Sequence, residues 1–186
     1  MYYAVCSDKV RPYKHEPENI FIMTANNDNI MPCCNLPEEC QLHIKTFAQL
    51  TLDELYALLR IRSEVFIVEQ NCVYQDVDNS DQTAFHLWLT RGDKIVAVCR
   101  ICPRGTKLEE VSIGRVVTTE RGRGYGKLIM QAAIDTAKRR IADIACIDIE
   151  AQADKRGFYE GLGFKAMSEP FMMEGLPHMH MRLDVD

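Results

Sequence analysis

The sequence lacks any hydrophobic run that approaches the ~20 residues needed to cross a bilayer, so it predicts no membrane-spanning helix. Residues 1–14 also lack the apolar stretch, followed by small residues, that marks a secretory signal. We therefore expect a cytoplasmic protein without a membrane partner. What the chain does have is a length of 186 residues and a hydrophobic fraction of 47%, which suit one globular domain with a buried core.

Positive charge is also in deficit. The 22 Lys and Arg residues are outnumbered by 27 Asp and Glu residues, which gives a net charge of -5. An acidic protein binds polyanions poorly, so nucleic acid is not the expected partner. Basic residues are nevertheless concentrated at Arg121, Arg123 and Lys127. A local positive spot of this kind suits a small anionic ligand.

A second cysteine pair with zinc-finger spacing is absent. Cys99 and Cys102 form a C-x-x-C, but they lie in an apolar run typical of a buried strand, and a structural zinc site needs about four ligands. His178 and His180 share one face of a predicted strand, and nothing else in the sequence converges on them. We therefore expect reduced structural thiols and no metal.

The order of predicted elements indicates the fold class. Residues 1–40 show no sustained period, and we interpret them as an N-terminal extension with little regular structure. Three helices are expected within residues 41–186. The first follows a capping box at Thr51 and Glu54, the second follows a glycine-rich loop, and the third is short and ends at Gly163. Strands are expected over residues 41–46, 85–90, 95–101, 111–118, 144–149, 164–167 and 179–183. This pattern predicts an α+β domain with α/β/α layers and a mixed sheet of about six to seven strands.

The glycine-rich loop carries the clearest chemistry. Arg121, Gly122, Arg123, Gly124, Tyr125, Gly126 and Lys127 lie between a predicted strand and a predicted helix. A helix N-terminus attracts phosphate, and glycines let the backbone approach its oxygens. The alternative is a flexible turn with solvated arginines. A Walker loop is excluded because Leu128 follows Gly126-Lys127, and the glycine spacing does not fit a dinucleotide fingerprint.

The chain resembles the GCN5-related N-acetyltransferase (GNAT) family. Arg121-x-x-Gly124-x-Gly126 is similar to the pyrophosphate motif of that family, and Phe158-Tyr159-x-x-Leu162-Gly163-Phe164 is similar to its typical later motif. The resemblance is closest to the ElaA branch and covers roughly residues 41–184. It is carried there by residues 58–70, Tyr74-Gln75-Asp76-x-Asp78, residues 113–117, Ala151-Gln152-Ala153 and Gly175-Leu176-Pro177-His178-x-x-Met181.

The resemblance implies a donor site for acetyl-CoA. The loop from Arg121 to Lys127 would hold the pyrophosphate, and the backbone of Val116, Val117 and Thr118 would pair with the pantetheine arm. Tyr159 matches the family's general acid, which would protonate the departing CoA thiolate. A purely structural role, with the Tyr159 ring packed beside other aromatic residues, is the alternative.

The acceptor side is less defined. Glu150 and His178 rank together as the general base, with Glu69 or a water relay as alternatives, and each of these side chains also has a structural interpretation. Arg115, Gln152 and Tyr74 are candidates for binding the acceptor. Arg62 lies on an apolar helix face, so we expect an internal ion pair. The acidic run Asp76, Asp78 and Asp81 suits either a solvated loop, which we favour, or a cationic acceptor.

The expected reaction is direct transfer of the acetyl group from the thioester to a primary amine. A cysteine-linked intermediate is disfavoured because no cysteine lies in a matching motif beside a histidine. The sequence leaves open whether the acceptor is a peptide amine, an amino-sugar phosphate or a polyamine. It also leaves open a noncatalytic acyl-CoA sensor, and it is compatible with a homodimer.

Overall fold

The computed structural model describes residue 37 and residues 39–185. Its core is one mixed, eight-stranded sheet in the order β1-β2-β3-β4-β5-β8-β6, with β7 paired to β8. The strands are β1 (Cys40–Thr46), β2 (Phe85–Arg91), β3 (Lys94–Cys102), β4 (Val111–Thr118), β5 (Cys146–Gln152), β6 (Lys165–Ala166), β7 (Phe171–Met173) and β8 (Leu176–Asp184). Neighbouring strands are antiparallel except for the β4–β5 pair.

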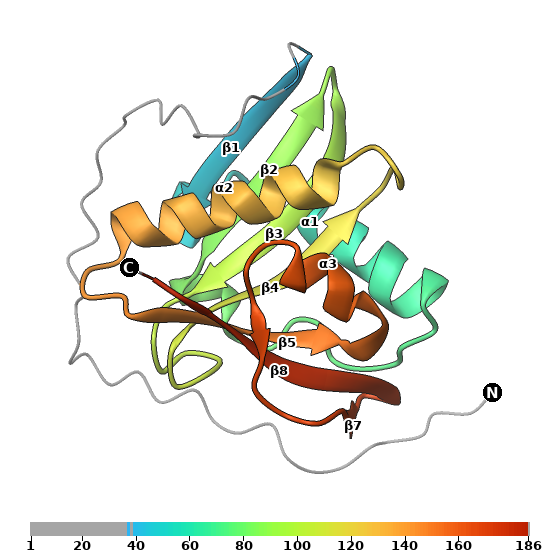
Figure 1. Cartoon of the computed structure of the whole chain (residues 1–186). Coiled ribbons are helices and arrows are strands. Elements are labelled where there is room, and N and C mark those ends of the chain that lie inside the picture. Colours follow the sequence, from blue (N-terminus) through green and yellow to red (C-terminus); the bar gives the residue numbers. More distant parts are fainter. Residues whose placement is uncertain (1–36, 38, 186) are drawn as a thin grey trace.

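Helices cover both faces of this sheet (Figure 1). The helix α2 (Tyr125–Arg140) and the short helix α3 (Arg156–Glu160) lie on one face, and α1 (Leu52–Arg62) lies on the other. The α+β class, the three layers and the mixed sheet are therefore confirmed. None of the helices in the described part of the chain is long and apolar enough to cross a membrane.

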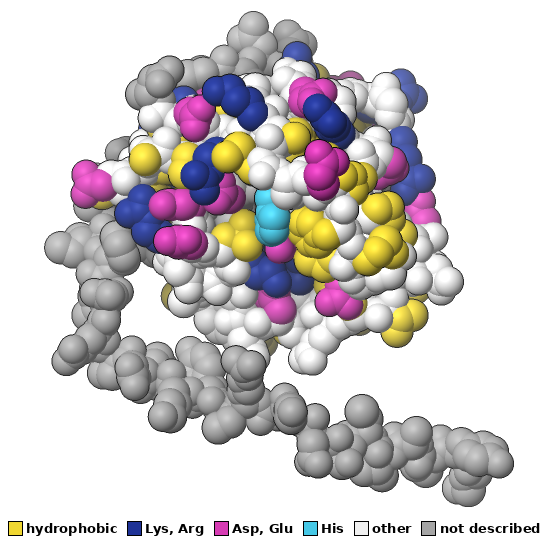
Figure 2. All heavy atoms as spheres, turned by 60° about the horizontal axis from the view of Figure 1, so that its bottom comes forward, with side chains coloured by type: hydrophobic (Ala, Val, Ile, Leu, Met, Phe, Trp, Pro, Cys, Tyr) yellow, Lys and Arg dark blue, Asp and Glu magenta, His cyan; other side chains and the backbone are white. Residues whose placement is uncertain are grey.

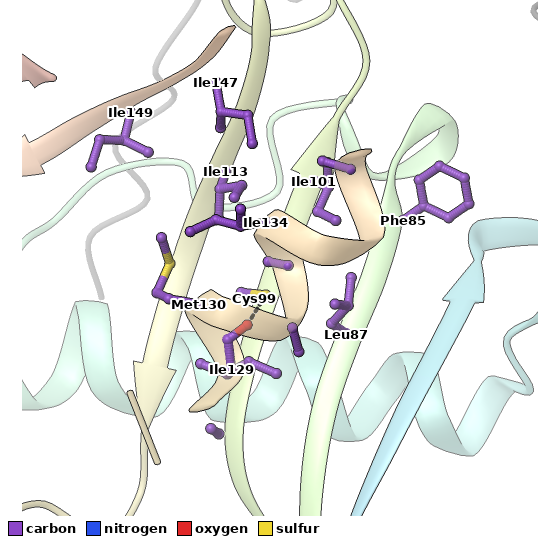
Figure 3. Packing of buried hydrophobic residues seen from close by; sticks show 14 of the residues in the cluster. Phe85, Leu87, Cys99, Ile101, Ile113, Ile129, Met130, Ile134, Ile147 and Ile149 are labelled. Atoms are coloured by element: carbon purple, nitrogen blue, oxygen red, sulfur yellow. Dashed lines mark hydrogen bonds between the residues drawn. The ribbon is translucent and has the colours of Figure 1, made fainter. Parts of the chain in front are cut away.

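The central strands are buried on both faces of the sheet. Their side chains point alternately into two hydrophobic clusters, one on each face. Leu87 and Leu89 of β2 pack in the cluster under α2, whereas Trp88 packs in the cluster under α1. Figure 3 shows Ile129, Met130 and other α2 side chains lying against this sheet. Burying one such aliphatic side chain contributes roughly 1.5–3 kcal/mol.

The predicted helix boundaries depend on local signals that the structure contains. Thr51 Oγ1 accepts a hydrogen bond from the Glu54 amide, and Glu54 accepts one from the Thr51 amide. Gly124, at φ 79, is the N-cap of α2. After α3, Gly163 at φ 94 reverses the chain into Phe164, whose amide donates to the Tyr159 carbonyl.

The structure adds two features to the predicted order. The first is a π-helical segment, η2 (Ser63–Glu69), which continues α1. The second is β7, which forms a hairpin with β8. The predicted extension over residues 1–40 lies outside the described residues up to its last few positions, and β1 begins at Cys40.

Candidate active site

A cleft of about 1210 Å³ opens where β4 and β5 separate. These parallel strands pair only at Val111 with Ile147 and at Ser112 with Asp148. Beyond that point, the cleft is lined by Ile113–Thr118 on one side and by Ile149, Glu150 and Gln152 on the other. The β4 edge that faces β5 therefore offers backbone donors and acceptors to a ligand instead of to a neighbouring strand.

A β-bulge distorts β4 beside the cleft. The β3–β4 register shifts between Val98 and Arg100, so that Arg115 and Val116 together oppose one residue of β3. Arg115 is in the left-handed region at φ 55, which is uncommon for a residue with a side chain. Such conformations cost energy and persist where the surrounding structure holds them, often at functional sites.

On the α2 face, the cleft ends at the glycine-rich loop. Gly122 and Gly124 both have positive φ, and the first turn of α2 has no side-chain cap. Its first amides are therefore available to an anion. They also form the positive end of the helix dipole, which attracts negative charge. Gly126 leaves room that a side chain would fill, because an added Cβ would lie 3.5 Å from Phe158 Cζ.

The same face carries Tyr159. Its ring packs edge-on against Phe158 and Phe164, at centroid distances of 5.0 and 6.1 Å. Burial, with smaller effects of Cys99 and Asp154, raises the pKa of Tyr159 to about 12. The side chain lines the cleft and stays protonated near neutral pH, so packing and proton donation are both available to it.

Three polar side chains that line the cleft share the opposite face of the sheet. Ile149, Ala151 and Met179 belong to the core under α2. Because strand side chains alternate, Glu150, Gln152 and His178 point the other way. Gln152 lies directly across from His178 in the β5–β8 pair, which brings their Cβ atoms to about 5 Å.

The environment of His178 orients its ring. The residue is 8% exposed, and its Nδ1 lies 2.9 Å from the Leu176 carbonyl oxygen. A carbonyl only accepts, so Nδ1 carries the proton and Nε2 of the neutral ring presents a lone pair. Nε2 has no hydrogen-bond partner among the described residues. His178 lines the cleft, so the anchoring role and the role of a base both stay open to it.

Segments from the α1 side close this half of the cleft. Gln152 Nε2 donates to Gln70 Oε1 at 3.0 Å, and Cys72 Sγ donates to the Glu174 carbonyl at 3.0 Å. These bonds tie β5 and the β7–β8 turn to the chain that follows η2. The guanidinium of Arg115 lies 5.3 Å from the Tyr74 ring centroid.

A buried network of ion pairs holds the segment after η2, which contains Asp76, Asp78 and Asp81. Arg62 donates to Asp76 at 2.9 Å and to Asp81 at 2.7 Å, which confirms the predicted internal ion pair. Arg100 donates to Asp78 at 2.8 Å and to Asp81 at 3.1 Å. Burial raises the pKa of Asp78, but bonds and charges from Arg100 and Arg115 outweigh it and hold that pKa below its usual range.

The network corrects one interpretation of the sequence. Asp76 and Asp81 are 5% and 3% exposed, so the acidic run is not a solvated loop. Nor is it open to a cationic acceptor, since its carboxylates already bind arginines. Arg115 lines the cleft as predicted, but its Nη2 donates to Asp78 at 3.0 Å and its Nε lies 2.8 Å from Asp76 Oδ1. The Tyr74 hydroxyl likewise donates to Asp76, at 3.0 Å.

The structure brings all but one of the predicted site residues to the cleft. Arg123 is the exception, being exposed outside the lining. Tyr125 contributes mainly backbone, because its ring is buried and its hydroxyl accepts a bond from Arg91. Cys72 and the turn at Met173–Glu174 line the cleft without having been predicted. Gly175 after an apolar run was the available signal for that turn, since a hairpin with two positive φ values favours glycine.

The face shown in Figure 2 carries no continuous basic patch of the kind that a polyanion would need. Over the face shown in Figure 2, basic and acidic side chains of the described residues are interspersed, with hydrophobic side chains between them. No group of three or more metal-ligating side chains is assembled within residues 39–185. The described cysteines, Cys40, Cys72, Cys99, Cys102 and Cys146, are buried free thiols.

Known proteins match nearly the whole of the described part of the chain. A family model for the acetyltransferase (GNAT) domain matches residues 35–185. ElaA of Escherichia coli is 37% identical over 142 residues, covering 74% of this chain and 92% of ElaA. A UPF0039 protein of Schizosaccharomyces pombe is 36% identical over 144 residues, covering 76% of this chain and 95% of that protein.

Solved structures agree with the sequence comparisons. The crystal structure of an acyl-CoA N-acyltransferase from Pseudomonas aeruginosa matches with a TM-score of 0.72 and 38% identity, covering 77% of this chain and 99% of that one. The crystal structure of Escherichia coli ElaA also matches with a TM-score of 0.72, at 35% identity, covering 78% and 99%. The chain therefore belongs to the GNAT acetyltransferase family and, within it, to the ElaA-like branch.

Proposed function

We propose that this protein transfers an acetyl group directly from acetyl-CoA to a primary amine. The observation that carries the proposal is the cleft itself. It passes through the sheet from an anion cradle and Tyr159 on one face to Glu150 and His178 on the other. Donor and acceptor would thus approach the same point from opposite faces.

The donor would bind along β4. Free amides at the start of α2, with Arg121 and Lys127 beside them, suit a pyrophosphate. The unpaired edge over Val116, Val117 and Thr118 suits the amide groups of pantetheine. An amide near the β4 bulge would stabilise the oxyanion that forms at the thioester carbonyl.

The acceptor must lose a proton before its nitrogen can attack. His178 Nε2 is one base for this step, and Glu150 on the same face is the other. Attack of the amine forms the new C–N bond, and collapse of the tetrahedral intermediate breaks the C–S bond. Tyr159 would protonate the thiolate as it leaves, coupled to departure because a thiol is more acidic than this tyrosine.

The test measures thiol release from acetyl-CoA across a panel of amines, with calorimetric binding of acetyl-CoA in parallel. We expect release that depends on the amine, and an acetylated amine detected by mass spectrometry. Binding of acetyl-CoA without release for every amine would overturn the proposal and favour a noncatalytic sensor. Transfer of the acetyl group to the protein itself in the absence of amine would overturn the direct mechanism.

A further inference from the structure

One segment of the chain crosses the acceptor half of the cleft from wall to wall. It comprises residues 70–76, which follow η2, and we call it the strap. On the β5 side, the Gln70 side chain accepts a hydrogen bond from Gln152 at 3.0 Å. On the β4 side, the centroid of the Tyr74 ring lies 5.3 Å from the guanidinium of Arg115. The strap therefore joins the two strands whose separation opens the cleft.

The β7–β8 turn also contacts the strap. Cys72 Sγ donates a hydrogen bond to the Glu174 carbonyl oxygen at 3.0 Å. Cys72 is 7% exposed and Tyr74 is partly buried, and both line the cleft. Val73 between them is 82% exposed. The inner side chains of the strap thus face the cleft and its outer side faces solvent, so the strap forms a wall over the acceptor half.

Both ends of the strap are fixed. Near its start, the Cys72 amide donates a hydrogen bond to the Phe66 carbonyl oxygen at 3.1 Å. At its end, the carboxylate of Asp76 lies 2.9 Å from Arg62 Nε, and both residues are buried. Moving the strap away would deprive the buried charge of Arg62 of one partner, which is costly. The strap is therefore a fixed part of the cleft and not a lid.

The candidate bases of the proposed function lie on the face of the sheet that the strap covers. Glu150 and His178 point to the same face as Gln152, whose side chain bonds the strap. An amine that reaches them must pass between the strap and the sheet. A small molecule can do so, whereas a lysine on a folded protein brings with it a surface that would clash with the strap.

We propose that the acceptor is a free small-molecule amine with a slim chain next to its nitrogen, and not a lysine on the surface of a folded protein. The strap would select this acceptor by steric exclusion. The inference rests on the proposed function and names the acceptor class for it.

One bacterial lysate, separated by ultrafiltration into its native proteins and its small molecules, tests the acceptor class. Each fraction receives the protein and isotopically labelled acetyl-CoA. We expect label in amines of the small-molecule fraction, and no labelling of protein lysines above a control without the protein. Labelling of native protein lysines at a rate equal to or above that of the small amines would overturn the proposal while leaving N-acetyl transfer intact. Label in neither fraction, with no turnover in the amine panel, would instead remove the proposed function.

A variant of the strap tests whether it limits the width of the acceptor. The amines n-butylamine and cyclohexylmethylamine present the same primary amine on a slim and on a bulky chain. Gln70→Ala removes the hydrogen bond to Gln152. It is expected to raise the ratio of kcat/KM for cyclohexylmethylamine to that for n-butylamine roughly 2- to 10-fold, the factor that one neutral hydrogen bond contributes. This ratio does not depend on the fraction of protein that is folded.

Matched variants outside the cleft serve as controls. Gln131→Ala should leave the ratio unchanged, because Gln131 bonds Asp135 within α2 and does not line the cleft. Cys72→Ala should shift the ratio in the same direction as Gln70→Ala, since it removes the bond to the β7–β8 turn. Cys146→Ala, which removes a buried thiol outside the cleft lining, should not shift it. Unchanged ratios in both strap variants would contradict the steric role of the strap.

Discussion

The carboxylate of Glu69 forms an ion pair with the guanidinium of Arg121, which joins the end of η2 to the first residue of the glycine loop. The two side chains are 47% and 65% exposed, so the pair itself contributes at most about 1 kcal/mol. The pair matters because a bound pyrophosphate would compete with Glu69 for Arg121. A pyrophosphate bound at the N-terminus of α2 has the same sign as Glu69 and needs the same arginine.

Removing the competing carboxylate should therefore strengthen donor binding. We expect Glu69→Gln to lower the Kd of CoA roughly 2- to 5-fold, within the range of one exposed ion pair. Arg121→Gln should raise that Kd on the order of 10-fold, through loss of a charge-assisted hydrogen bond. Calorimetry measures both effects, and added salt should reduce both.

Glu64→Gln is the control for Glu69→Gln. Glu64 is an exposed glutamate of the same η2 segment and pairs with Arg60 instead. It should leave CoA affinity unchanged. Weaker CoA binding by Glu69→Gln would show that Glu69 supports the donor instead of competing with it.

The backbone of Gly124 gives a second prediction. A Cβ added there meets no atom within 4 Å, so only its φ of 79 opposes a substitution. Gly124→Ala should cost about 1–2 kcal/mol of stability. It should also raise the Kd of CoA, because relaxation of that strain moves the free amides of α2.

Gly105→Ala provides the matched control for this change. Gly105 has φ 74 and open space, but it lies outside the cleft lining. A similar loss of stability with unchanged CoA affinity is expected, measured by urea unfolding and calorimetry. Equal CoA affinity in both glycine variants would argue against an anion site at the α2 N-terminus.

The pKa of Tyr159 sets a pH prediction. Because that pKa is raised to about 12, the hydroxyl remains protonated throughout the usual assay range. It loses its proton only as the pH approaches 12. The rate should therefore show no alkaline decline from Tyr159 below about pH 11. Tyr159→Phe should lower kcat by roughly 10²–10⁴-fold and change the Kd of CoA far less.

Tyr56→Phe controls for the loss of a hydroxyl, since Tyr56 is 72% exposed on α1. Its kcat should match the unsubstituted protein. If Tyr159→Phe weakened CoA binding as much as it slowed turnover, the acid role would be wrong and the packing role would be favoured.

Sequence reasoning succeeded where the signal is local. The capping box at Thr51 and Glu54, the helix stop at Gly163 and the loop before α2 each depend on residues close together in the chain. The buried environment of the acidic run could not be predicted in this way. Asp78 binds Arg100, which is 22 residues away on β3, and no spacing rule connects them.

The candidate site also has one part that local sequence signals predict and one part that depends on long-range pairing. Strand alternation alone places Glu150 and Gln152 on one face, but only the β5–β8 register brings His178 directly across from Gln152. The π-helical turn that ends at Glu69 also has no sequence signature here, because its residues fit an α-helix equally well. Long-range pairing therefore determines the acceptor half, whereas local motifs determine the donor half.

The buried pair of Arg62 and Asp81 gives a prediction about stability. Their side chains are 3% and 4% exposed. Burial raises the pKa of Asp81, but hydrogen bonds and charge from Arg62 and charge from Arg100 outweigh it, so the pKa is lowered overall. Asp81→Asn leaves two buried arginines short of a carboxylate and should cost about 3–5 kcal/mol. Glu160→Gln, which removes one exposed partner of Arg156, should cost less than about 1 kcal/mol.

The direction of the Asp78 and Asp81 shifts also determines how stability changes with pH. A carboxyl whose pKa is lower in the folded protein stabilises it fully above the unfolded pKa of about 3.9 and loses that contribution as pH falls toward the folded pKa. Urea unfolding should therefore show stability declining below about pH 4 in the unsubstituted protein. The decline should be shallower in Asp81→Asn, because that position no longer takes up a proton on unfolding. Parallel declines in the two proteins would mean that Asp81 does not contribute to acid sensitivity.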